Sequence, residues 1–248
     1  MAIIWQQTVD GTKYEVRSAG SSIRLYNRNQ LNTQYSPRHF FTGSVWDLLT
    51  LPALLAKTEL SRVLVLGVGG GTVIHQLDQI YRPPCIIGIE LDPIHIRIAR
   101  EFFDLDRPNL KVHAGDAIQW VKEYRGARFD LIIDDLFLER DGQPLRTIGA
   151  GTAWLRQLLR VLSPRGILVQ NHISSADLAG SAVLQDSRIQ SRFASAFKFS
   201  LPLFENAVGA YYRDQTKIST GPKAVDKLLR HRFDLSDRRL RFRARRLF

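Results

Sequence analysis

The sequence predicts an α/β fold in which a mainly parallel β-sheet carries helices on both faces and follows a small antiparallel β-unit. Three observations predict it. Short apolar runs such as 63–66 and 85–89 alternate with longer stretches of helical character. The first run leads into the glycine cluster of Gly67, Gly69 and Gly71, which is typical of a turn from a strand into a helix. Residues before about 42 alternate polar and apolar side chains, as antiparallel strands do.

The first predicted unit is a small antiparallel sheet over residues 1–42. Tyr14-Glu15-Val16-Arg17 and Ile23-Arg24-Leu25-Tyr26 alternate in polarity. Asp10-Gly11 and Gly20-Ser21 are turn signals between such runs. We therefore expect the main domain to occupy residues 43–220.

The main domain is expected to contain a strand, a glycine turn and a helix in that order. Val63–Leu66 is apolar without alternation, as in a parallel strand covered on both faces. The glycines that follow allow a sharp turn and leave the backbone open to a ligand. The helix is predicted from Thr72 to Tyr81, because Pro83 and Pro84 then stop it.

A second buried strand, Cys85–Ile89, delivers Glu90 at its carboxyl end. Open α/β sheets bind ligands at that end of their strands, where a carboxylate can accept hydrogen bonds from both hydroxyls of a ribose. The glycine spacing argues against a nicotinamide dinucleotide, because the G-x-G-x-x-G fingerprint counted from Gly67 reaches Thr72 instead of Gly or Ala. The alternative interpretation is that the glycine cluster forms a tight turn from strand to helix and binds no ligand.

Acidic residues follow the third and fourth predicted strands, 110–114 and 129–133. Asp116 starts a helical stretch, and Asp134 and Asp135 are adjacent at the end of their strand. Because neighbouring side chains of a strand point to opposite faces, at most one of the two faces a bound cofactor. We expect Asp134 to point away and to be structural.

The fifth predicted strand, Gly166–Gln170, runs into Asn171 and His172. The chain beyond it is expected to form one helix and then a β-hairpin at the edge of the sheet. These elements are the helix Asp177–Ala196 and the hairpin strands Phe197–Leu203 and Ala207–Arg213, with the turn at Glu205-Asn206.

The G-x-G-x-G spacing of Gly67, Gly69 and Gly71 resembles the first motif of class I S-adenosylmethionine (AdoMet) methyltransferases. The resemblance implies a Rossmann-like fold with a mainly parallel, seven-stranded sheet and an antiparallel edge strand. It also implies that these glycines and Glu90 bind AdoMet, and that Asp116 bonds the adenine amino group.

More narrowly, residues 20 to 215 resemble spermidine synthase, an aminopropyltransferase with the same fold. The motifs that carry the likeness are Val-Leu-Val-Leu-Gly (63–67), Ile-Glu-Leu-Asp (89–92), Ala-Gly-Asp-Ala (114–117) and Phe-Asp-Leu-Ile-Ile-Asp-Asp (129–135). The resemblance implies that Gln30, at the end of Leu25-Tyr26-Asn27-Arg28-Asn29-Gln30, contacts the cofactor and that Asp135 is the catalytic aspartate. It also implies that the N-terminal β-unit pairs subunits into a homodimer.

The chain departs from the aminopropyltransferase pattern where that family binds its substrates. Gly70 replaces the aspartate that contacts the aminopropyl amine and disfavours the carboxylate of AdoMet. Arg38-His39-Phe40 replaces a Tyr-His-Glu motif, and Leu138 replaces the second acid of an Asp-Ser-Ser-Asp loop. A desolvated diamine needs several carboxylates. The sequence therefore favours methyl transfer from AdoMet to an unknown small-molecule or macromolecular acceptor.

The alternative is a polyamine aminopropyltransferase that uses decarboxylated AdoMet. In that case Glu139, Asp141 or Asp47 replaces the missing acids.

Asp135 and His172 are the candidate catalytic residues. Asp135 is either a general base for an acceptor amine or hydroxyl, or a strand-end acid that caps a loop. His172 either shuttles a proton beside the acceptor or is simply hydrogen-bonded. No metal site is predicted, because no ligand spacing to Cys or to acid pairs is found for His39, His75, His95 and His113.

Composition limits the class of protein. The 248 residues, with 44% hydrophobic side chains, suffice for one α/β core and a small appendage. No apolar stretch is long enough to span a bilayer, and no secretory signal precedes Gln6. Cys85 is the single cysteine, so no internal disulfide can form. These features predict a soluble, cytoplasmic protein.

The C-terminal segment 221–248 is strongly basic. Residues 224–248 hold nine Lys or Arg and three Asp, a net charge of +6 out of +11 for the chain. Arginines alternate with apolar groups over 240–246, so the segment either packs its apolar groups on the domain or binds nucleic acid or an acidic partner. A third functional hypothesis is therefore a non-catalytic nucleoside- or nucleic-acid-binding protein.

Overall fold

The computed structural model describes the chain except for residues 57–58, 141–142, 216–226, 228–229 and 231–241. Its first unit is an antiparallel sheet in the order β1-β2-β3-β4. The strands are β1 Ala2–Val9, β2 Thr12–Ala19, β3 Ser22–Asn27 and β4 Gln30–Tyr35. The hairpin turns use residues with positive φ, among them Asp10 (48°), Arg28 (46°) and Asn29 (66°). The small antiparallel unit expected from the sequence is therefore present.

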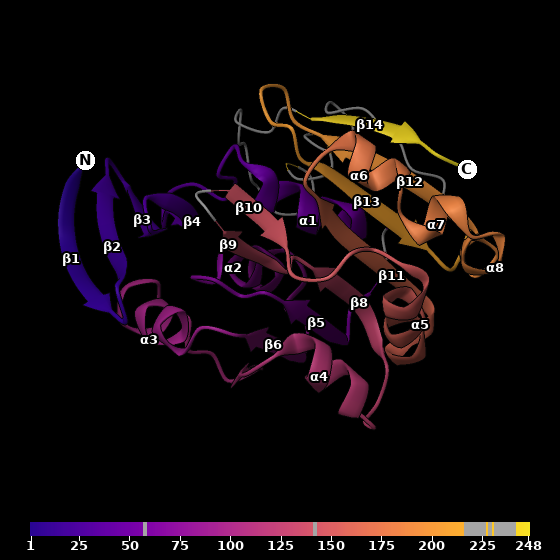
Figure 1. Cartoon of the computed structure of the whole chain (residues 1–248), viewed down its shortest axis with the longest axis horizontal. Helices are drawn as coiled ribbons and strands as arrows, with labels where there is room; N and C mark the ends of the chain where they lie inside the picture. Colours follow the sequence, from indigo (N-terminus) through magenta and orange to yellow (C-terminus); the bar gives the residue numbers. More distant parts are fainter. Residues whose placement is uncertain (57–58, 141–142, 216–226, 228–229, 231–241) are drawn as a thin grey trace.

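The second unit is a mixed sheet in the order β14-β12-β13-β11-β8-β5-β6-β7 (Figure 1). The strands from β11 to β7 are parallel, whereas β13, β12 and β14 are antiparallel. Their bounds are β5 Arg62–Leu66, β6 Cys85–Glu90, β7 Leu110–Ala114, β8 Phe129–Asp134, β11 Leu162–His172, β12 Ser195–Ser200, β13 Ala207–Tyr212 and β14 Arg243–Arg246.

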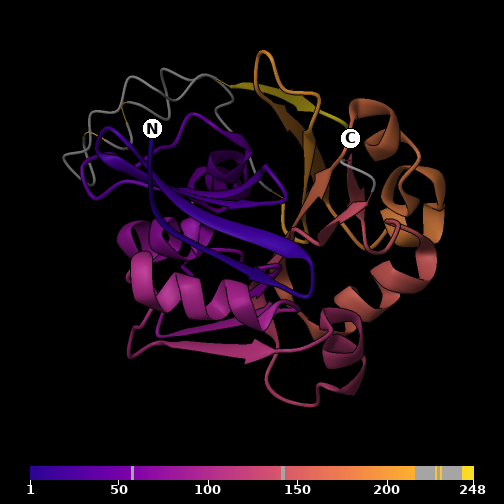
Figure 2. The same ribbon diagram turned by 60° about the vertical axis from the view of Figure 1, so that its left-hand side comes forward.

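Helices cover both faces of this sheet, as Figures 1 and 2 show. Apolar side chains of α1 and α2 pack on one face, and those of α4, α5, α7 and α8 pack on the other. A third cluster joins the N-terminal sheet to α3 through Tyr14, Val16, Leu25, Ile98 and Phe103. The helices are α1 Val45–Ala56, α2 Thr72–Tyr81, α3 Pro93–Phe102, α4 Ala117–Glu123, α5 Thr152–Val161, α6 Ser175–Ala179, α7 Ala182–Gln185 and α8 Ser187–Gln190.

The sheet has eight strands in place of the seven expected, because the end of the chain adds β14 beside β12. Phe242 is buried, with its ring 6.1 Å from that of Phe199, while Arg243, Arg245 and Arg246 are exposed. This described end of the basic segment therefore packs its apolar residue on the domain. The remainder of the predicted segment, 221–226, 228–229 and 231–241, lies outside the described residues.

The single helix expected over Asp177–Ala196 is wrong, since the chain forms three short helices there. Local hydrogen bonds end and restart the helix. Gly180 caps α6 through its backbone N–H, and Asp186 accepts from the backbone N–H of Arg188 to start α8. The predicted hairpin is confirmed as β12 and β13.

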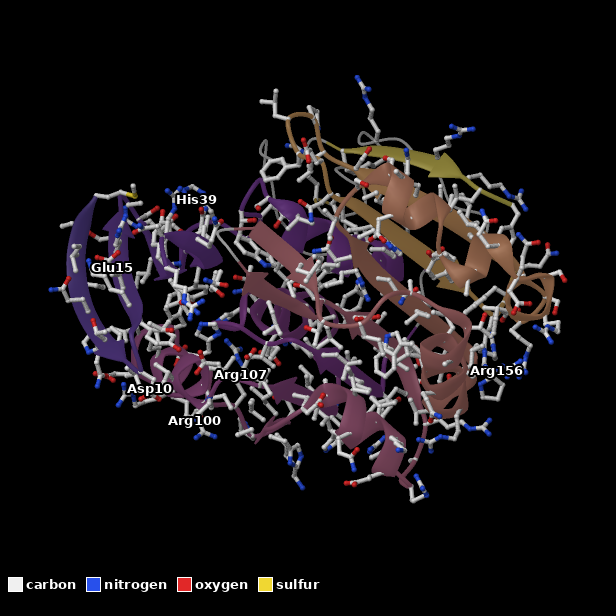
Figure 3. The ribbon with its side chains drawn as sticks, in the orientation of Figure 1. Asp10, Glu15, His39, Arg100, Arg107 and Arg156 are labelled. Atoms are coloured by element: carbon white, nitrogen blue, oxygen red, sulfur yellow. The ribbon has the colours of Figure 1, made fainter. Side chains whose placement is uncertain are left out.

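A two-stranded hairpin, β9 Phe137–Arg140 and β10 Gln143–Arg146, follows β8 and was not predicted. It stands over the carboxyl edge of the large sheet (Figure 1). Charged side chains are spread over the molecule, as Arg100 on α3 and Arg156 on α5 illustrate in Figure 3. No helix among the described residues is long and apolar enough to cross a membrane.

Candidate functional site

The glycine loop joins β5 to α2 at the carboxyl edge of the sheet. Gly67, Gly69 and Gly71 have φ angles of 85°, 53° and 91°, which other residues rarely adopt. A Cβ on Gly67 would lie 2.3 Å from the backbone oxygen of Asp135, and one on Gly71 would lie 2.3 Å from Leu105 Cδ1. The backbone contact at Gly67 and the positive φ of both residues therefore favour glycine at these positions, whether or not a ligand binds.

Glu90 closes β6 and lies against this loop. Its Oε2 accepts hydrogen bonds from the backbone N–H of Val68 (3.0 Å) and Gly69 (2.8 Å), and its Oε1 accepts one from Asp92 N–H (3.0 Å). Burial raises the pKa of Glu90, but these bonds and the nearby His95 outweigh it and leave the pKa below its ordinary value. Glu90 is therefore a buried, ionised carboxylate at the end of the strand where the sequence predicted a ribose contact.

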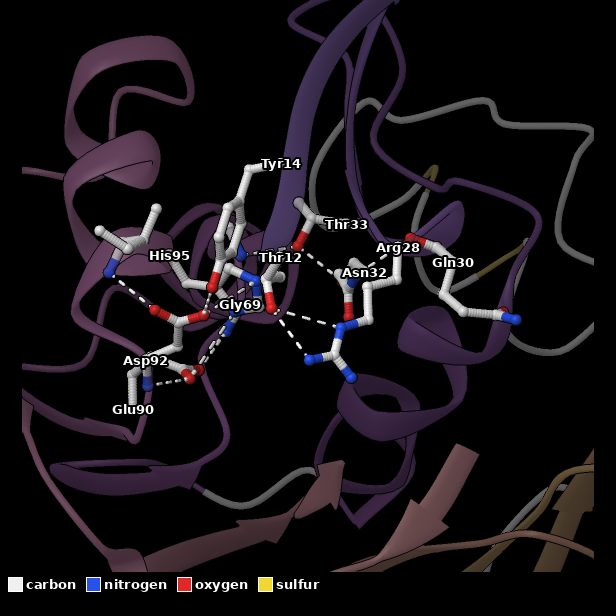
Figure 4. A network of polar contacts seen from close by, with 12 residues as sticks. Thr12, Tyr14, Arg28, Gln30, Asn32, Thr33, Gly69, Glu90, Asp92 and His95 are labelled. Atoms are coloured by element: carbon white, nitrogen blue, oxygen red, sulfur yellow. Dashed lines mark hydrogen bonds and ion pairs between the residues drawn. The ribbon is translucent and has the colours of Figure 1, made fainter. Parts of the chain in front are cut away.

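A polar network connects Glu90 to the N-terminal sheet (Figure 4). The His95 ring lies 3.7 Å from Glu90 Oε1 and 3.8 Å from Asp92 Oδ2. The hydroxyl of Tyr14 on β2 donates to the same Asp92 oxygen at 2.7 Å. Asp92 also accepts from Ile94 N–H, so it caps α3 just before Pro93. The N-terminal sheet thus helps to fix the acids beside the loop.

Strand β4 packs directly on the glycine loop. Thr33 Oγ1 accepts from the backbone N–H of Gly70 at 2.6 Å, and the Thr72 hydroxyl donates to the backbone oxygen of Gln34 at 2.9 Å. A Cβ on Gly70 would lie only 2.6 Å from Thr33 Cγ2. A larger residue at position 70 would therefore require Thr33 to shift.

Gln30, predicted to contact the cofactor, lies away from this loop. It is exposed at the start of β4, directly after the β3–β4 turn, and its side chain points away from Glu90 in Figure 4. Thr33, farther along β4, reaches the loop instead, and the backbone oxygen of Asn32 lies nearby. Sequence reasoning missed both residues, because the resemblance did not fix how far the strand continues past its turn.

Asp116, predicted to bind the adenine amino group, caps α4 by accepting from Ile118 N–H at 2.7 Å. Asp116 is exposed. Glu90 pairs with Ala114 on β7, so Asp116, two residues after Ala114, follows the end of the neighbouring strand. Glu90 and Asp116 therefore stand at neighbouring strand ends, an arrangement compatible with contacts to a ribose and an attached base.

Asp134 and Asp135 point to opposite faces of the sheet, as the period of a strand requires. Asp134 is fully buried, and its Oδ2 accepts hydrogen bonds from Arg146 (2.9 Å), Trp154 (2.9 Å) and Gln170 (2.8 Å). These partners identify Asp134 as a structural residue, as expected.

Asp135 is half-buried and has a different environment. Its Oδ1 accepts from the Asn171 amide at 2.8 Å, and Asn171 in turn accepts from the Asn206 amide at 3.2 Å. Burial raises the pKa of Asp135 to about 6, against the lowering effect of Asn171 and Arg146. A carboxylate with this pKa can accept a proton near neutral pH.

His172 does not meet Asp135. Its ring is fully buried, 3.3 Å from Asp177 Oδ2 and 3.4 Å from the Tyr211 hydroxyl. Burial lowers the pKa of His172 to about 4, and Arg146 adds to the effect. The side chain of His172 belongs to the Asp134 face, which argues against the predicted proton shuttle.

Asn171 is the residue of β11 that the prediction missed. Gln170 pairs with Asp134 in the parallel register, so Asn171 follows on the face of Asp135. This alternation was available from the sequence. Among the described residues, no group of three or more His, Cys, Asp or Glu side chains is arranged to hold a metal ion.

Known proteins match the central domain. A family model described as a methyltransferase domain covers residues 57–215. A polyamine aminopropyltransferase of Vibrio vulnificus (strain CMCP6) is 29% identical over 62% of this chain and 50% of its own length. The eEF1A lysine and N-terminal methyltransferase of Bos taurus is 26% identical over 50% of this chain and 19% of its own length. The chain thus spans about half the length of the curated aminopropyltransferases it matches.

Solved structures share the fold. A probable spermidine synthase from Corynebacterium glutamicum ATCC 13032 gives a TM-score of 0.72 at 18% identity, covering 93% of this chain and 88% of that one. Human methyltransferase-like protein 13 in complex with SAH gives a TM-score of 0.53 at 20% identity, covering 74% of this chain and 86% of that one. These likenesses confirm the predicted Rossmann-like class I methyltransferase fold.

Proposed function

The chain belongs to the methyltransferase domain family, and we propose that it is an AdoMet-dependent methyltransferase. AdoMet supplies a methyl group that is already activated by its sulfonium. The task left to this chain is to bind the nucleoside, orient an acceptor and take up a proton. Positioning of this kind can contribute about 7 to 11 kcal/mol to catalysis.

The residues at the carboxyl edge suit the nucleoside. Glu90 would accept from the ribose hydroxyls, and Asp116, on the neighbouring strand end, would bond the adenine amino group. The Gly67, Gly69 and Gly71 turn brings the loop backbone beside Glu90, as the two hydrogen bonds from the loop to this carboxylate illustrate.

The contact between Gly70 and Thr33 is the observation that carries the choice of AdoMet. In the aminopropyltransferases that this chain resembles, an aspartate at the place of Gly70 disfavours the carboxylate of AdoMet. Here a Cβ on Gly70 would lie 2.6 Å from Cγ2, 2.9 Å from Cβ and 3.0 Å from Oγ1 of Thr33. Glycine at this position gives the loop no charge that repels the AdoMet carboxylate, and a larger residue there would require Thr33 to shift.

Asp135 is the proposed general base. A nucleophilic nitrogen or oxygen of the acceptor forms a bond to the methyl carbon while the bond from carbon to sulfur breaks. The acceptor proton passes to Asp135, whose raised pKa, about 6, favours this transfer. Asn171 fixes the orientation of the carboxylate through its amide.

Aminopropyl transfer from decarboxylated AdoMet is the second candidate, favoured by the names of the curated relatives. It needs carboxylates for the diamine. Asp47 cannot serve, because it is fully buried and accepts from Thr42, Gly43 and Gln76. Asp141 and the side chain of Glu139 lie outside the described part of the chain.

A product assay tests the proposal. The protein is incubated with AdoMet and fractions of a small-molecule cell extract, and in parallel with decarboxylated AdoMet and putrescine. Methyl transfer predicts S-adenosylhomocysteine that increases with enzyme in the first mixture and no 5′-methylthioadenosine in the second. The opposite pattern would establish aminopropyl transfer.

A further inference from the structure

The last strand of the large sheet, β14, turns two arginines away from the core. Phe242 is buried, and Ala244 packs on the same apolar cluster. The two-residue period of the strand then turns Arg243 and Arg245 to the opposite face. Both arginines are exposed, and neither forms an ion pair within the described part of the chain. Two cations, about 7 Å apart along the strand, are therefore available to an anion.

A third cation lies directly opposite this pair. Lys198 on β12 is the cross-strand partner of Arg245, so the two side chains leave the sheet on the same face. Its Nζ donates to Ser175 Oγ at 3.2 Å. Like charges opposite each other destabilise paired strands, and neither β12 nor β14 contains an acid to balance them. An anion bound to Arg243, Arg245 and Lys198, the cation row, would relieve this repulsion.

An exposed aromatic ring lies next to the cation row. Phe204 is 43% exposed in the turn between β12 and β13. Ser200 at the end of β12 pairs with Arg243, and Figures 1 and 2 both show this turn beside the start of β14. Glu205 follows Phe204 and is exposed, so phosphates are expected at the cation row and not at the ring. The ring is left for an uncharged, flat group.

This arrangement fits single-stranded nucleic acid. Such strands bind where cations pair with the phosphates and an aromatic side chain stacks on a base. A duplex keeps its bases stacked on one another and offers mainly its phosphates. An acidic peptide would use the cations alone, so the ring favours the nucleic acid. The net charge of +11 on the chain also favours association with a polyanion.

The cation row is separate from the candidate site. Arg243 and Asp135 both lie at the carboxyl edge of the parallel strands. The strand order β14-β12-β13-β11-β8 places four strand spacings, about 19 Å, between them. A strand bound at the cation row therefore need not contact Asp135, and its binding can be measured apart from catalysis.

We propose that the cation row and Phe204 form a binding surface for single-stranded nucleic acid. Phosphates of the strand pair with the guanidinium groups of Arg243 and Arg245 and with the Lys198 ammonium. One base stacks on the Phe204 ring. This surface is a second binding site of the chain and does not depend on the proposed methyl transfer.

The test measures fluorescence anisotropy without AdoMet, using a labelled strand of about 12 nucleotides, as RNA and as DNA, and the DNA duplex of the same sequence. Arg243→Gln/Arg245→Gln is compared with the control Arg128→Gln/Arg156→Gln, which removes the same charge. The control arginines are also exposed, with Arg128 directly before β8 and Arg156 on α5 (Figure 3). Circular dichroism checks that each variant folds.

The wild type should bind the single strand more tightly than the duplex. Loss of two phosphate contacts in the β14 variant should weaken binding and make the slope of log affinity against log salt shallower by about 1.4. The control should keep the wild-type affinity and slope. Equal losses in the two variants would show that only net charge matters and would overturn the proposal, as would absence of binding by the wild type.

The aromatic contact is tested by Phe204→Ala, with Leu203→Ala as the control. Loss of one stacked base should weaken single-strand binding about 5- to 150-fold and leave duplex binding unchanged. Leu203 is fully exposed in the same turn, and its variant should bind as the wild type does. Equal affinity of Phe204→Ala and wild type, or displacement of the strand by polyglutamate as readily as by unlabelled strand, would refute the surface. Because AdoMet is absent, either result leaves the proposed methyl transfer unaffected.

Discussion

The two faces of the strand end at Asp134 and Asp135 provide different environments for two adjacent carboxylates. On one face, Asp134 is fully buried and bonded to a guanidinium, an indole and an amide, with His172 buried on the same side. On the other face, Asp135 is half-buried, and among the described residues the amide of Asn171 is the one hydrogen-bond donor to its carboxylate.

The comparison shows that the number of hydrogen-bond donors distinguishes a structural carboxylate from one that can exchange a proton. A carboxylate that receives several buried donors holds elements together and cannot release them without cost. A carboxylate with a single orienting donor and a raised pKa can exchange a proton. Adjacent residues of identical type reach these two states because the strand turns them to opposite faces.

The largest expected effect is on folding, from Asp134→Asn. Arg146 would lose its buried counter-ion, and breaking a buried pair costs about 3 to 5 kcal/mol. Urea unfolding measures this loss. Asp135→Asn is the matched control and should unfold at the wild-type urea concentration or above. Equal stabilities for the two variants would remove the distinction between the faces.

The next effect is on catalysis, from Asp135→Asn. Loss of a general base should lower the rate of S-adenosylhomocysteine formation about 10² to 10⁴-fold, while AdoMet affinity stays near the wild-type value. Initial rates with the active acceptor fraction measure it. A variant that retains full activity would leave Asp135 as a residue that only caps a loop.

The pH dependence sharpens this prediction. Because burial raises the pKa of Asp135 to about 6, the ionised base is depleted below that pH, and kcat/KM should rise with pH through about 6. The same shift means that ionisation of Asp135 destabilises the folded state as pH rises from about 4 to 6. Asp135→Asn should lack both dependences. An unchanged kinetic profile in the variant would assign the proton transfer to another group.

A smaller effect is expected on cofactor affinity from Glu90→Ala. Removing a charged hydrogen-bond acceptor for the ribose should weaken AdoMet binding by about 1.5 to 3 kcal/mol. Glu101→Ala, on the exposed surface of α3, is the control and should bind normally. Calorimetry distinguishes the two. Wild-type affinity in the Glu90 variant would refute the ribose contact.

The smallest effect should come from His172→Gln. Because its imidazole faces Asp177 and Tyr211, the variant should keep the wild-type rate and the wild-type pH profile, although it loses some stability. A rate loss comparable to that of Asp135→Asn would restore the proton shuttle predicted from the sequence.

Continuous apolar runs predicted the parallel strands, and the two-residue period of a strand predicted the opposite directions of Asp134 and Asp135, because both patterns are local. The position of β4 against the glycine loop depends on residues far apart in the chain, so the sequence did not predict that Thr33, farther along β4 than Gln30, bonds the loop. The eighth strand, β14, also needed a distant partner, β12. The burial of His172 beside Tyr211 cannot be predicted from neighbouring residues, whereas the face on which Asn171 lies follows from the period of the strand alone.

The most direct test of the account is a calorimetric titration of the wild-type protein with AdoMet and, separately, with decarboxylated AdoMet. Gly70 gives the loop no acid that would repel the AdoMet carboxylate. AdoMet should therefore bind more tightly than the decarboxylated form. Tighter binding of decarboxylated AdoMet would contradict it and assign the site to aminopropyl transfer.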